Sequence, residues 1–254
     1  MYQRLHLKKS LGQHFLRDDA IAQKIANCLQ HLGRTTIEIG PGDGALTHWM
    51  LPKRNGQVYL VEVDERLVGQ LKKAYEGPDV HVVHADVLTW PLSSLPAPLS
   101  IIGNLPYNIS SRIFFKIFAH QHLVEEVVCM VQHEVAARIA SPPGSRVYGI
   151  LSVLLQAFYK VEYLFTVPPT AFEPPPKVMS GVVRLTHRHQ PLPCDPLQLQ
   201  KVVKVAFHQR RKKLRNALAS FGVALDRFPP GLADKRAEQL SVPDFIHLTQ
   251  VIYA

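Results

Sequence analysis

Short apolar runs that alternate with helical stretches are the feature that most constrains the fold of this chain. Strands are predicted at residues 35–39, 57–63, 80–84, 99–103, 126–132, 160–166 and 178–185. Helices are expected in most of the gaps, and Asp18 or Asp19 can cap the first one. Such alternation is typical of an α/β protein with a mostly parallel sheet that is covered on both faces. Ligands of such sheets bind at the carboxyl ends of the strands.

The end of the predicted sheet departs from this pattern. The last two strands are joined by the proline-rich segment 168–176, with no helix between them. A parallel pair normally needs a crossover of about a dozen residues, so we expect the final strand to be inserted antiparallel. Residues 186–196 contain three prolines and little apolar content, which is typical of a linker. We therefore expect an α/β domain at 1–188 and a small all-helical domain at 189–254.

Composition excludes several classes of protein. The longest apolar segment, 149–158, is too short to cross a membrane and is expected to be a buried helix. The amino end lacks the apolar core of a secretory signal, so a cytoplasmic location is expected. The three cysteines, Cys28, Cys129 and Cys194, are far apart, which suits neither a disulfide framework nor a metal centre.

The net charge of +9 is concentrated at the two ends of the chain. Residues 1–17 carry four basic groups and no acid, whereas residues 197–254 carry ten basic and four acidic groups. Basic ends on a nearly neutral body favour a polyanion as partner, with nucleic acid ahead of an acidic membrane surface because no amphipathic anchor is evident. The alternative is a cationic surface that serves only solubility.

A glycine-rich motif, EIGPGDG at residues 38–44, lies between the first strand and the next helix. Gly40 and Gly42 let the backbone turn tightly and approach a ligand. The third glycine follows the first by four positions, one fewer than in the dinucleotide fingerprint, which disfavours a nicotinamide cofactor. Glu62 and Asp86 end the next two strands, where they can accept hydrogen bonds from a ribose diol and an adenine amine. An ordinary turn with capping acids is the alternative.

A second motif, Asn104-Leu105-Pro106-Tyr107, directly follows the predicted strand at 99–103. An exocyclic adenine nitrogen is neutral and weakly nucleophilic, so it needs orientation more than a strong base. If the Asn104 side-chain oxygen and the Leu105 carbonyl each accept one N–H, the lone pair can face an electrophilic carbon. Pro106 supplies a rigid turn, and Tyr107 can stack on the base. A simple turn followed by a core tyrosine is the alternative.

Five segments of the chain together resemble the ribosomal small-subunit RNA adenine dimethyltransferases. They are SLGQHFL at 10–16, the glycine motif at 38–44, NLPYNIS at 104–110, FEPPPKV at 172–178 and FHQRRKKLRN at 207–216. The resemblance covers essentially the whole chain in order. It implies S-adenosylmethionine as methyl donor and a seven-stranded, Rossmann-like methyltransferase sheet. It also implies conversion of two adjacent adenosines near the 3′ end of 16S rRNA to N6,N6-dimethyladenosine, with a role in small-subunit biogenesis.

The resemblance also assigns roles to individual residues. Cofactor contacts are implied for His14, Leu16, Gly40, Glu62, Asp86 and Asn104, and Gly42 of the glycine motif joins them. Family members often have asparagine at the position of His14. Phe172, in the loop before the final strand, is expected to form the second aromatic wall of an adenine slot opposite Tyr107. The alternative for Phe172 is a loop anchor packed on the core.

The tract 207–216 carries five positive charges in ten positions, without acids at the spacings that would compensate them along a helix. We expect these five, and two lysines near the amino end, to contact RNA phosphates: Arg210, Arg211, Lys212, Lys213, Arg215, Lys8 and Lys9. A solvated helix face is the alternative.

The expected partner is small-subunit rRNA or an assembling small ribosomal subunit, with the enzyme acting as a monomer without a membrane. Two other functions stay open. One is an adenine methyltransferase acting on large-subunit rRNA, which would share the glycine motif and residues 104–107. The other is a ribosome-assembly or nucleic-acid binding factor in which catalysis is secondary.

Overall fold

The computed structural model describes residues 13–30, 35–54, 56–222, 224 and 227–254. Contacts divide the chain into two compact units, one made of 1–136 with 162–186 and the other of 137–161 with 187–254. This division differs from the contiguous boundary expected at residue 188. The segment 137–161 belongs to the second unit because its helix α6 (Ile150–Phe158) packs on α7 (Pro196–His208) and α9 (Val242–Tyr253).

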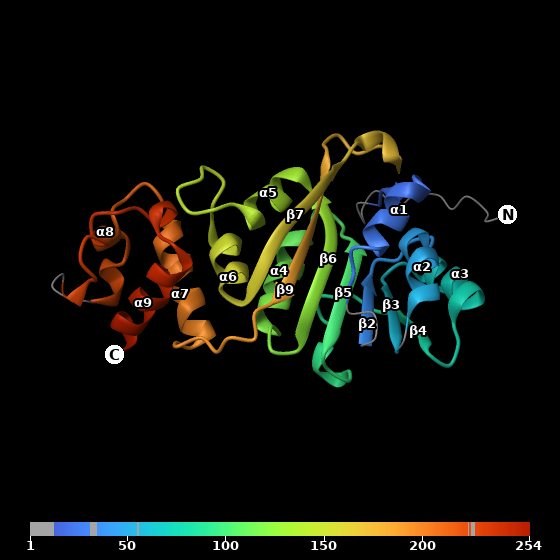
Figure 1. The fold of residues 1–254 in the computed structure, drawn as a ribbon, viewed down its shortest axis with the longest axis horizontal. Coiled ribbons are helices and arrows are strands. Elements are labelled where there is room, and N and C mark those ends of the chain that lie inside the picture. Colours follow the sequence, from blue (N-terminus) through green and yellow to red (C-terminus); the bar gives the residue numbers. More distant parts are fainter. Residues whose placement is uncertain (1–12, 31–34, 55, 223, 225–226) are drawn as a thin grey trace. The chain divides into compact units, whose positions relative to one another are not determined.

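Seven strands form one sheet in the order β4-β3-β2-β5-β6-β9-β7 (Figure 1). Strands β2 to β6 pair in parallel, and β9 is antiparallel to β6, which confirms the expected insertion of the last strand. Each strand begins and ends within two residues of its predicted position. Their bounds are β2 (Thr35–Ile39), β3 (Val58–Glu62), β4 (Val80–His84), β5 (Leu99–Asn104), β6 (Val124–Gln132), β7 (Tyr159–Val167) and β9 (Ser180–His187).

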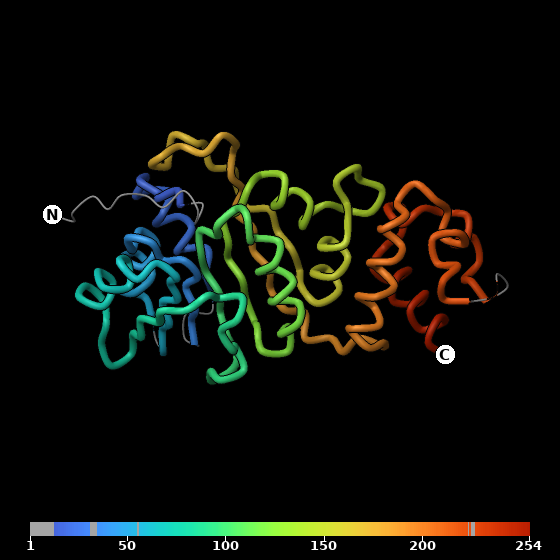
Figure 2. The backbone as a smooth tube through the Cα atoms, turned by 180° about the vertical axis from the view of Figure 1, so that it is seen from behind, coloured from blue at the N-terminus to red at the C-terminus, as the bar shows by residue number. Residues whose placement is uncertain are grey.

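Helices cover both faces of this sheet. The helix α4 (Ser110–Ala119) lies on one face, and α1 (Asp19–Ala26), α2 (Ala45–Met50) and α3 (Glu65–Tyr75) lie on the other, as opposite views show (Figure 1, Figure 2). The helix α5 (His133–Ala140) follows β6 directly. Strand β2 is buried along its whole length because it is central and covered on both sides. Its carboxyl end is thereby fixed where the glycine motif begins.

A two-stranded ribbon joins the start of the described chain to the loop before the last strand. In it β1 (Phe15–Leu16) pairs antiparallel with β8 (Phe172–Glu173). The Arg17 guanidinium extends the ribbon, because its Nε lies 3.1 Å from a carboxylate oxygen of Glu173 and it also pairs with Asp43 of the glycine motif. The ribbon thus ties the amino-terminal segment to the carboxyl edge of the sheet.

The second unit is helical outside β7, as predicted for the end of the chain. It adds α8 (Leu214–Ala217) and short 3-10 turns to α6, α7 and α9. The Asp195 side chain caps α7 by accepting from two backbone N–H groups, and the Phe207 and Phe245 rings stack in its core with centroids 5.9 Å apart. Within the described residues, no helix is both long enough and apolar enough to cross a bilayer.

Candidate active site

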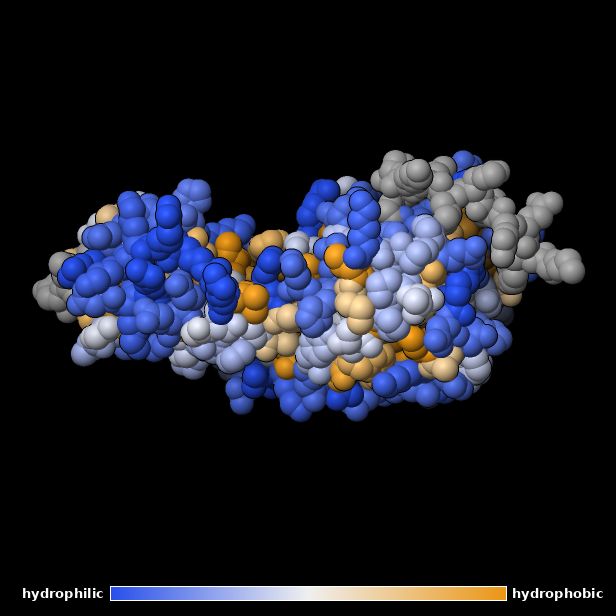
Figure 3. Space-filling view, turned by 90° about the horizontal axis from the view of Figure 1, so that it is seen from above, coloured by the Kyte–Doolittle hydropathy of each residue, from blue (hydrophilic) through white to orange (hydrophobic). Residues whose placement is uncertain are grey.

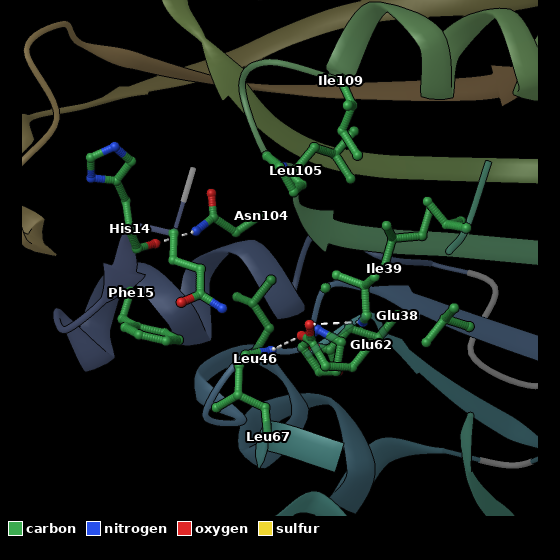
Figure 4. Close-up of a pocket in the computed structure, with 18 of the residues that line it drawn as sticks. His14, Phe15, Glu38, Ile39, Leu46, Glu62, Leu67, Asn104, Leu105 and Ile109 are labelled. Atoms are coloured by element: carbon green, nitrogen blue, oxygen red, sulfur yellow. Dashed lines mark hydrogen bonds between the residues drawn. The ribbon is translucent and has the colours of Figure 1, made fainter. Parts of the chain in front are cut away.

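A cavity of about 240 Å³ opens at the carboxyl ends of β2, β3, β4 and β5. Parallel strands bring the residues that follow them to one edge of a sheet, so motifs distant in sequence meet there. Asn104 and His14 lie on one side of the cavity and Glu62 on the other (Figure 4). The predicted residues that line it are His14, Leu16, Gly40, Gly42, Glu62, Asp86, Asn104, Leu105, Pro106 and Tyr107.

The glycine motif adopts a shape that requires glycine. Gly40 and Gly42 both have φ of +63°, in the left-handed region that side chains disfavour. A Cβ on Gly42 would also lie 3.1 Å from the Phe15 ring, so the motif and β1 approach each other closely. The motif therefore presents bare backbone to the cavity, with room for a ligand to approach the peptide groups.

Glu62 is held in place by three backbone donors. Its Oε2 accepts from the N–H of Gly42 at 3.2 Å, and its Oε1 accepts from Val63 and Asp64 at 2.9 and 3.0 Å. Burial raises the pKa of Glu62, and these backbone N–H groups oppose that rise. Since each carboxylate oxygen has two lone pairs, Glu62 keeps capacity to accept from a ribose diol.

Glu38 lines the same cavity and was not among the predicted site residues. It is 1% exposed, and its Oε2 accepts a hydrogen bond of 2.6 Å from the Thr47 hydroxyl. Burial, with the charge of Glu62 nearby, raises the pKa of Glu38 to about 7. An acid inside an otherwise uncharged buried strand was the sequence signal that could have identified it.

The Asn104 amide is oriented by the backbone of the residue just before β1. Its Nδ2 donates to the His14 carbonyl at 3.0 Å (Figure 4). Because a carbonyl only accepts, the amide oxygen of Asn104 is directed elsewhere and remains an acceptor. The N–H of Leu105 donates to the Met130 carbonyl at 3.0 Å, which fixes the start of the motif to β6. The side-chain oxygen of Asn104 is thus left as an acceptor beside the cavity, and the acceptor roles of Asn104 and Leu105 stay a prediction.

Tyr107 is fixed at both ends of its ring. Its hydroxyl is 2.6 Å from the Ser180 hydroxyl, and burial raises its pKa. The His14 imidazole stacks on the ring, with centroids 5.7 Å apart and an interplanar angle of 25°. The ring of Tyr107 is thus held by contacts at its hydroxyl and at one face.

Phe172 is not among the residues that line the cavity, and its expected place as the second wall of an adenine slot stays a prediction. It is 4% exposed and belongs to the hydrophobic core. The physical reason is the ribbon, which places Phe172 opposite Leu16, itself 5% exposed. This burial is also what the alternative, a loop anchor packed on the core, predicts.

The basic tract is partly neutralised by acids that lie elsewhere in the sequence. Lys213 and Arg215 both pair with Asp234, at 2.9 and 3.1 Å, and this holds the pKa of Asp234 below its usual range. Arg210 lies 3.6 Å from Glu238. The tract has no acids at helical spacings, but acids from another part of the chain pair with these three cations.

Two cations of the basic tract 207–216, Arg211 and Lys212, differ from the other three. Within the described part of the chain, no ion-pair partner is found for Arg211 or Lys212, and both are exposed. Hydrophilic side chains dominate the face of this unit that is visible at the left of Figure 3. Lys8 and Lys9, the other predicted RNA contacts, lie outside the described residues.

The fold and the cavity together define a class of enzyme. A seven-stranded sheet with one antiparallel strand, a glycine motif after β2, an acid at the end of β3 and the Asn-Leu-Pro-Tyr motif after β5 are the features of an S-adenosylmethionine-dependent methyltransferase. The family model described as ribosomal RNA adenine dimethylase matches residues 4–249. The chain belongs to this family.

Comparisons with individual proteins agree. A protein named ribosomal RNA small subunit methyltransferase A from Cytophaga hutchinsonii is 46% identical, over 98% of both chains. The protein of the same name from Porphyromonas gingivalis is 48% identical, again over 98% of both. A dimethyladenosine transferase structure from Plasmodium falciparum has a TM-score of 0.79 at 26% identity, covering 92% of this chain and 96% of that one. The 23S rRNA methyltransferase ErmE has a TM-score of 0.73 at 25% identity, covering 94% and 100%.

Proposed function

We propose that this enzyme transfers methyl groups from S-adenosylmethionine to two adjacent adenosines near the 3′ end of 16S rRNA, giving N6,N6-dimethyladenosine. The observation that carries the proposal is the Asn104 amide, which the His14 carbonyl orients at the edge of the cavity. The high identity to enzymes named for the small subunit favours that RNA over large-subunit rRNA. The enzyme then acts in the cytoplasm, as a monomer, on the RNA or on an assembling small subunit.

The residues of the cavity fit S-adenosylmethionine. Gly40 and Gly42 give backbone access, and Glu62 has acceptor capacity for the ribose hydroxyls. Asp86 is oriented by the Leu88 N–H, which donates to its Oδ1 at 2.9 Å, and its carboxylate is free to accept from the adenine amine. When bound, this cofactor supplies an electrophilic methyl carbon on a sulfonium.

The protein orients the N6 amine of the target adenosine, whose own lone pair attacks the methyl carbon. The Asn104 oxygen and the Leu105 carbonyl accept the two N–H bonds of the target amine, and Tyr107 supports the base. The methyl carbon that bound S-adenosylmethionine would supply is taken up by this lone pair, its bonding electrons staying with the sulfur, and the amine loses one proton to solvent. In the second round only one N–H remains, so one of the two acceptors suffices.

This function is tested by comparing methyl transfer to intact small-subunit RNA by the wild-type enzyme and by the Asn104→Ala variant. Removing one preorganised contact is expected to slow methyl transfer by about 10²- to 10³-fold. Calorimetry with S-adenosylmethionine should show the cofactor still bound. Asn27→Ala removes an exposed amide outside the cavity and serves as the matched control. Dimethylation by Asn104→Ala at the wild-type rate, measured by mass spectrometry of the RNA, would refute the assignment.

A further inference from the structure

The loop between β8 and β9, residues 174–179, exposes apolar side chains to solvent. Val178 is 44% exposed and Met179 is 42% exposed, and two exposed prolines precede them in the same loop. Among the described residues of the first unit, Val63 is the only other large apolar side chain that is exposed. Apolar side chains that gather on one loop, rather than scatter singly over the surface, indicate a contact surface.

This loop is held at both of its ends. At its start, the Pro174 carbonyl accepts a hydrogen bond of 2.8 Å from Nδ1 of His14. At its end, the Met179 carbonyl accepts from the N–H of His133 at 2.9 Å, and the buried Ser180 begins β9. Between these points, three consecutive prolines restrict the backbone. The exposed side chains are therefore presented on a stiff support, which lowers the cost of ordering them in a complex.

The loop lies beside the cavity that holds the reaction. Ser180 follows Met179 directly, and its hydroxyl is 2.6 Å from the hydroxyl of Tyr107, which lines the cavity. The connection from β7 to β9 lies beyond the carboxyl end of β6 (Figure 1). An RNA that delivers an adenosine to the cavity has to lay the neighbouring nucleotides along this edge of the sheet.

The charge of the loop fits a nucleic acid. Residues 174–180 contain Lys177 and no acid. Lys177 is exposed, and within the part of the chain that the structure describes no ion-pair partner is found for it. A cation that can neutralise a phosphate, next to apolar side chains that can contact bases, favours RNA over an apolar protein surface as the partner.

We propose that Val178 and Met179 form a wedge that enters the base stack of the rRNA next to the target adenosine. A base that leaves its stack opens a gap between its former neighbours, and apolar side chains can fill such a gap by inserting between base steps. The wedge keeps the gap from closing while Lys177 contacts a phosphate. This inference rests on the proposed function, since it takes an unstacked adenosine as the substrate, but it concerns the nucleotides that stay outside the cavity.

A pair of double variants tests the wedge on small ribosomal subunits that lack the methylation. Val178→Ser with Met179→Ser removes the apolar surface, whereas Val178→Leu with Met179→Leu keeps it. The serine variant should lower kcat/KM for the subunits by about ten- to hundredfold, as expected when about half of two apolar side chains is no longer buried. The leucine variant should stay within about threefold of the wild type. Cofactor affinity, measured by calorimetry, should change in neither.

Two single variants complete the design. Leu197→Ser is the matched control, because Leu197 is 68% exposed on α7 and does not line the cavity. It should leave kcat/KM unchanged. Lys177→Gln should make the salt dependence of binding to 16S rRNA shallower by about 0.7 in log-log slope, whereas the serine variant should weaken binding without changing this slope.

The outcomes separate the wedge from the proposed function. Wild-type enzyme that transfers no methyl group to the subunits overturns the proposed function and this inference with it. Active wild type with the serine variant equal to the leucine variant, or with Leu197→Ser equally impaired, overturns the wedge alone. A lowered thermal midpoint with unchanged kcat/KM makes the two residues structural and also overturns it. Normal binding of the serine variant to protein-free 16S rRNA, with weakened binding to subunits, makes a ribosomal protein the partner and overturns it as well.

Discussion

The buried carboxyl group of Glu38 gives the most quantitative prediction. Its pKa is ordinarily 4.5, and burial raises it to about 7 in the folded protein. Between these two values the folded state binds a proton that the unfolded state has released. Stability from this group is therefore fully present below pH 4.5 and is lost as the pH rises through 7. Glu38→Gln keeps the shape and the acceptor for Thr47 but cannot titrate.

The size of the effect follows from the two pKa values. Each pKa unit is worth about 1.4 kcal/mol, so ionising Glu38 in the fold costs about 3 kcal/mol at high pH. Most of that cost, about 2 to 3 kcal/mol, arises between pH 5 and pH 8. We expect the stability of the wild type relative to Glu38→Gln to fall by this amount across the interval.

Tryptophan fluorescence can measure this in the correct part of the molecule. Both tryptophans, Trp49 and Trp90, lie in the first unit, so urea unfolding followed by their emission reports on the unit that contains Glu38. Thr47→Val removes the hydrogen bond that lowers the pKa of Glu38, so its pH-dependent loss should extend to higher pH than in the wild type. Parallel stability profiles for wild type and Glu38→Gln from pH 5 to pH 8 would show that Glu38 is ionised throughout and refute the reasoning.

Two further predictions concern packing and RNA. A Cβ at Gly103 would lie 2.5 Å from the backbone oxygen of Ile39, so Gly103→Ala should force β2 and β5 apart and lower the free energy of unfolding by about 1 to 3 kcal/mol. Gly77→Ala, where a Cβ meets nothing within 4 Å, is the control in the same urea assay. Replacing Arg211 and Lys212 by Ala should make the salt dependence of RNA binding shallower by about 1.4 in log-log slope. An unchanged slope in filter binding would leave both as part of a solvated surface.

Elements with a repeating pattern could be predicted from the sequence. The apolar runs at β2 to β6 lie between turn residues, and the missing helix before β9 showed that this strand is reversed. The ribbon could not be predicted in this way. Its strands are two residues long, too short for any periodicity, and their pairing joins residues more than 150 positions apart. Tertiary contact alone determines such a pairing.

The same limit applies to the site. The place of Glu62, Asp86 and Asn104 at the cavity could be predicted because each lies at or just after the end of a strand, and strand ends meet at one edge of a parallel sheet. The stacking of His14 on Tyr107 depends on tertiary contact instead, so the sequence alone did not indicate it. The partners of Lys213 and Arg215 were missed for the same reason, because Asp234 lies about twenty residues away in an irregular segment.

The pairing of β1 with β8 also sets an order of events during synthesis. A growing chain has made all the strands that carry the cofactor residues once Asn104 has been added. It then lacks the partner of β1 until Phe172 and Glu173 have been added. At a translation rate of about 5 to 20 residues per second, this interval lasts several seconds. During that time β1 lacks its partner β8, so a nascent chain can pair β2, β3, β4 and β5 several seconds before the ribbon that holds the residues beside Asn104 can form.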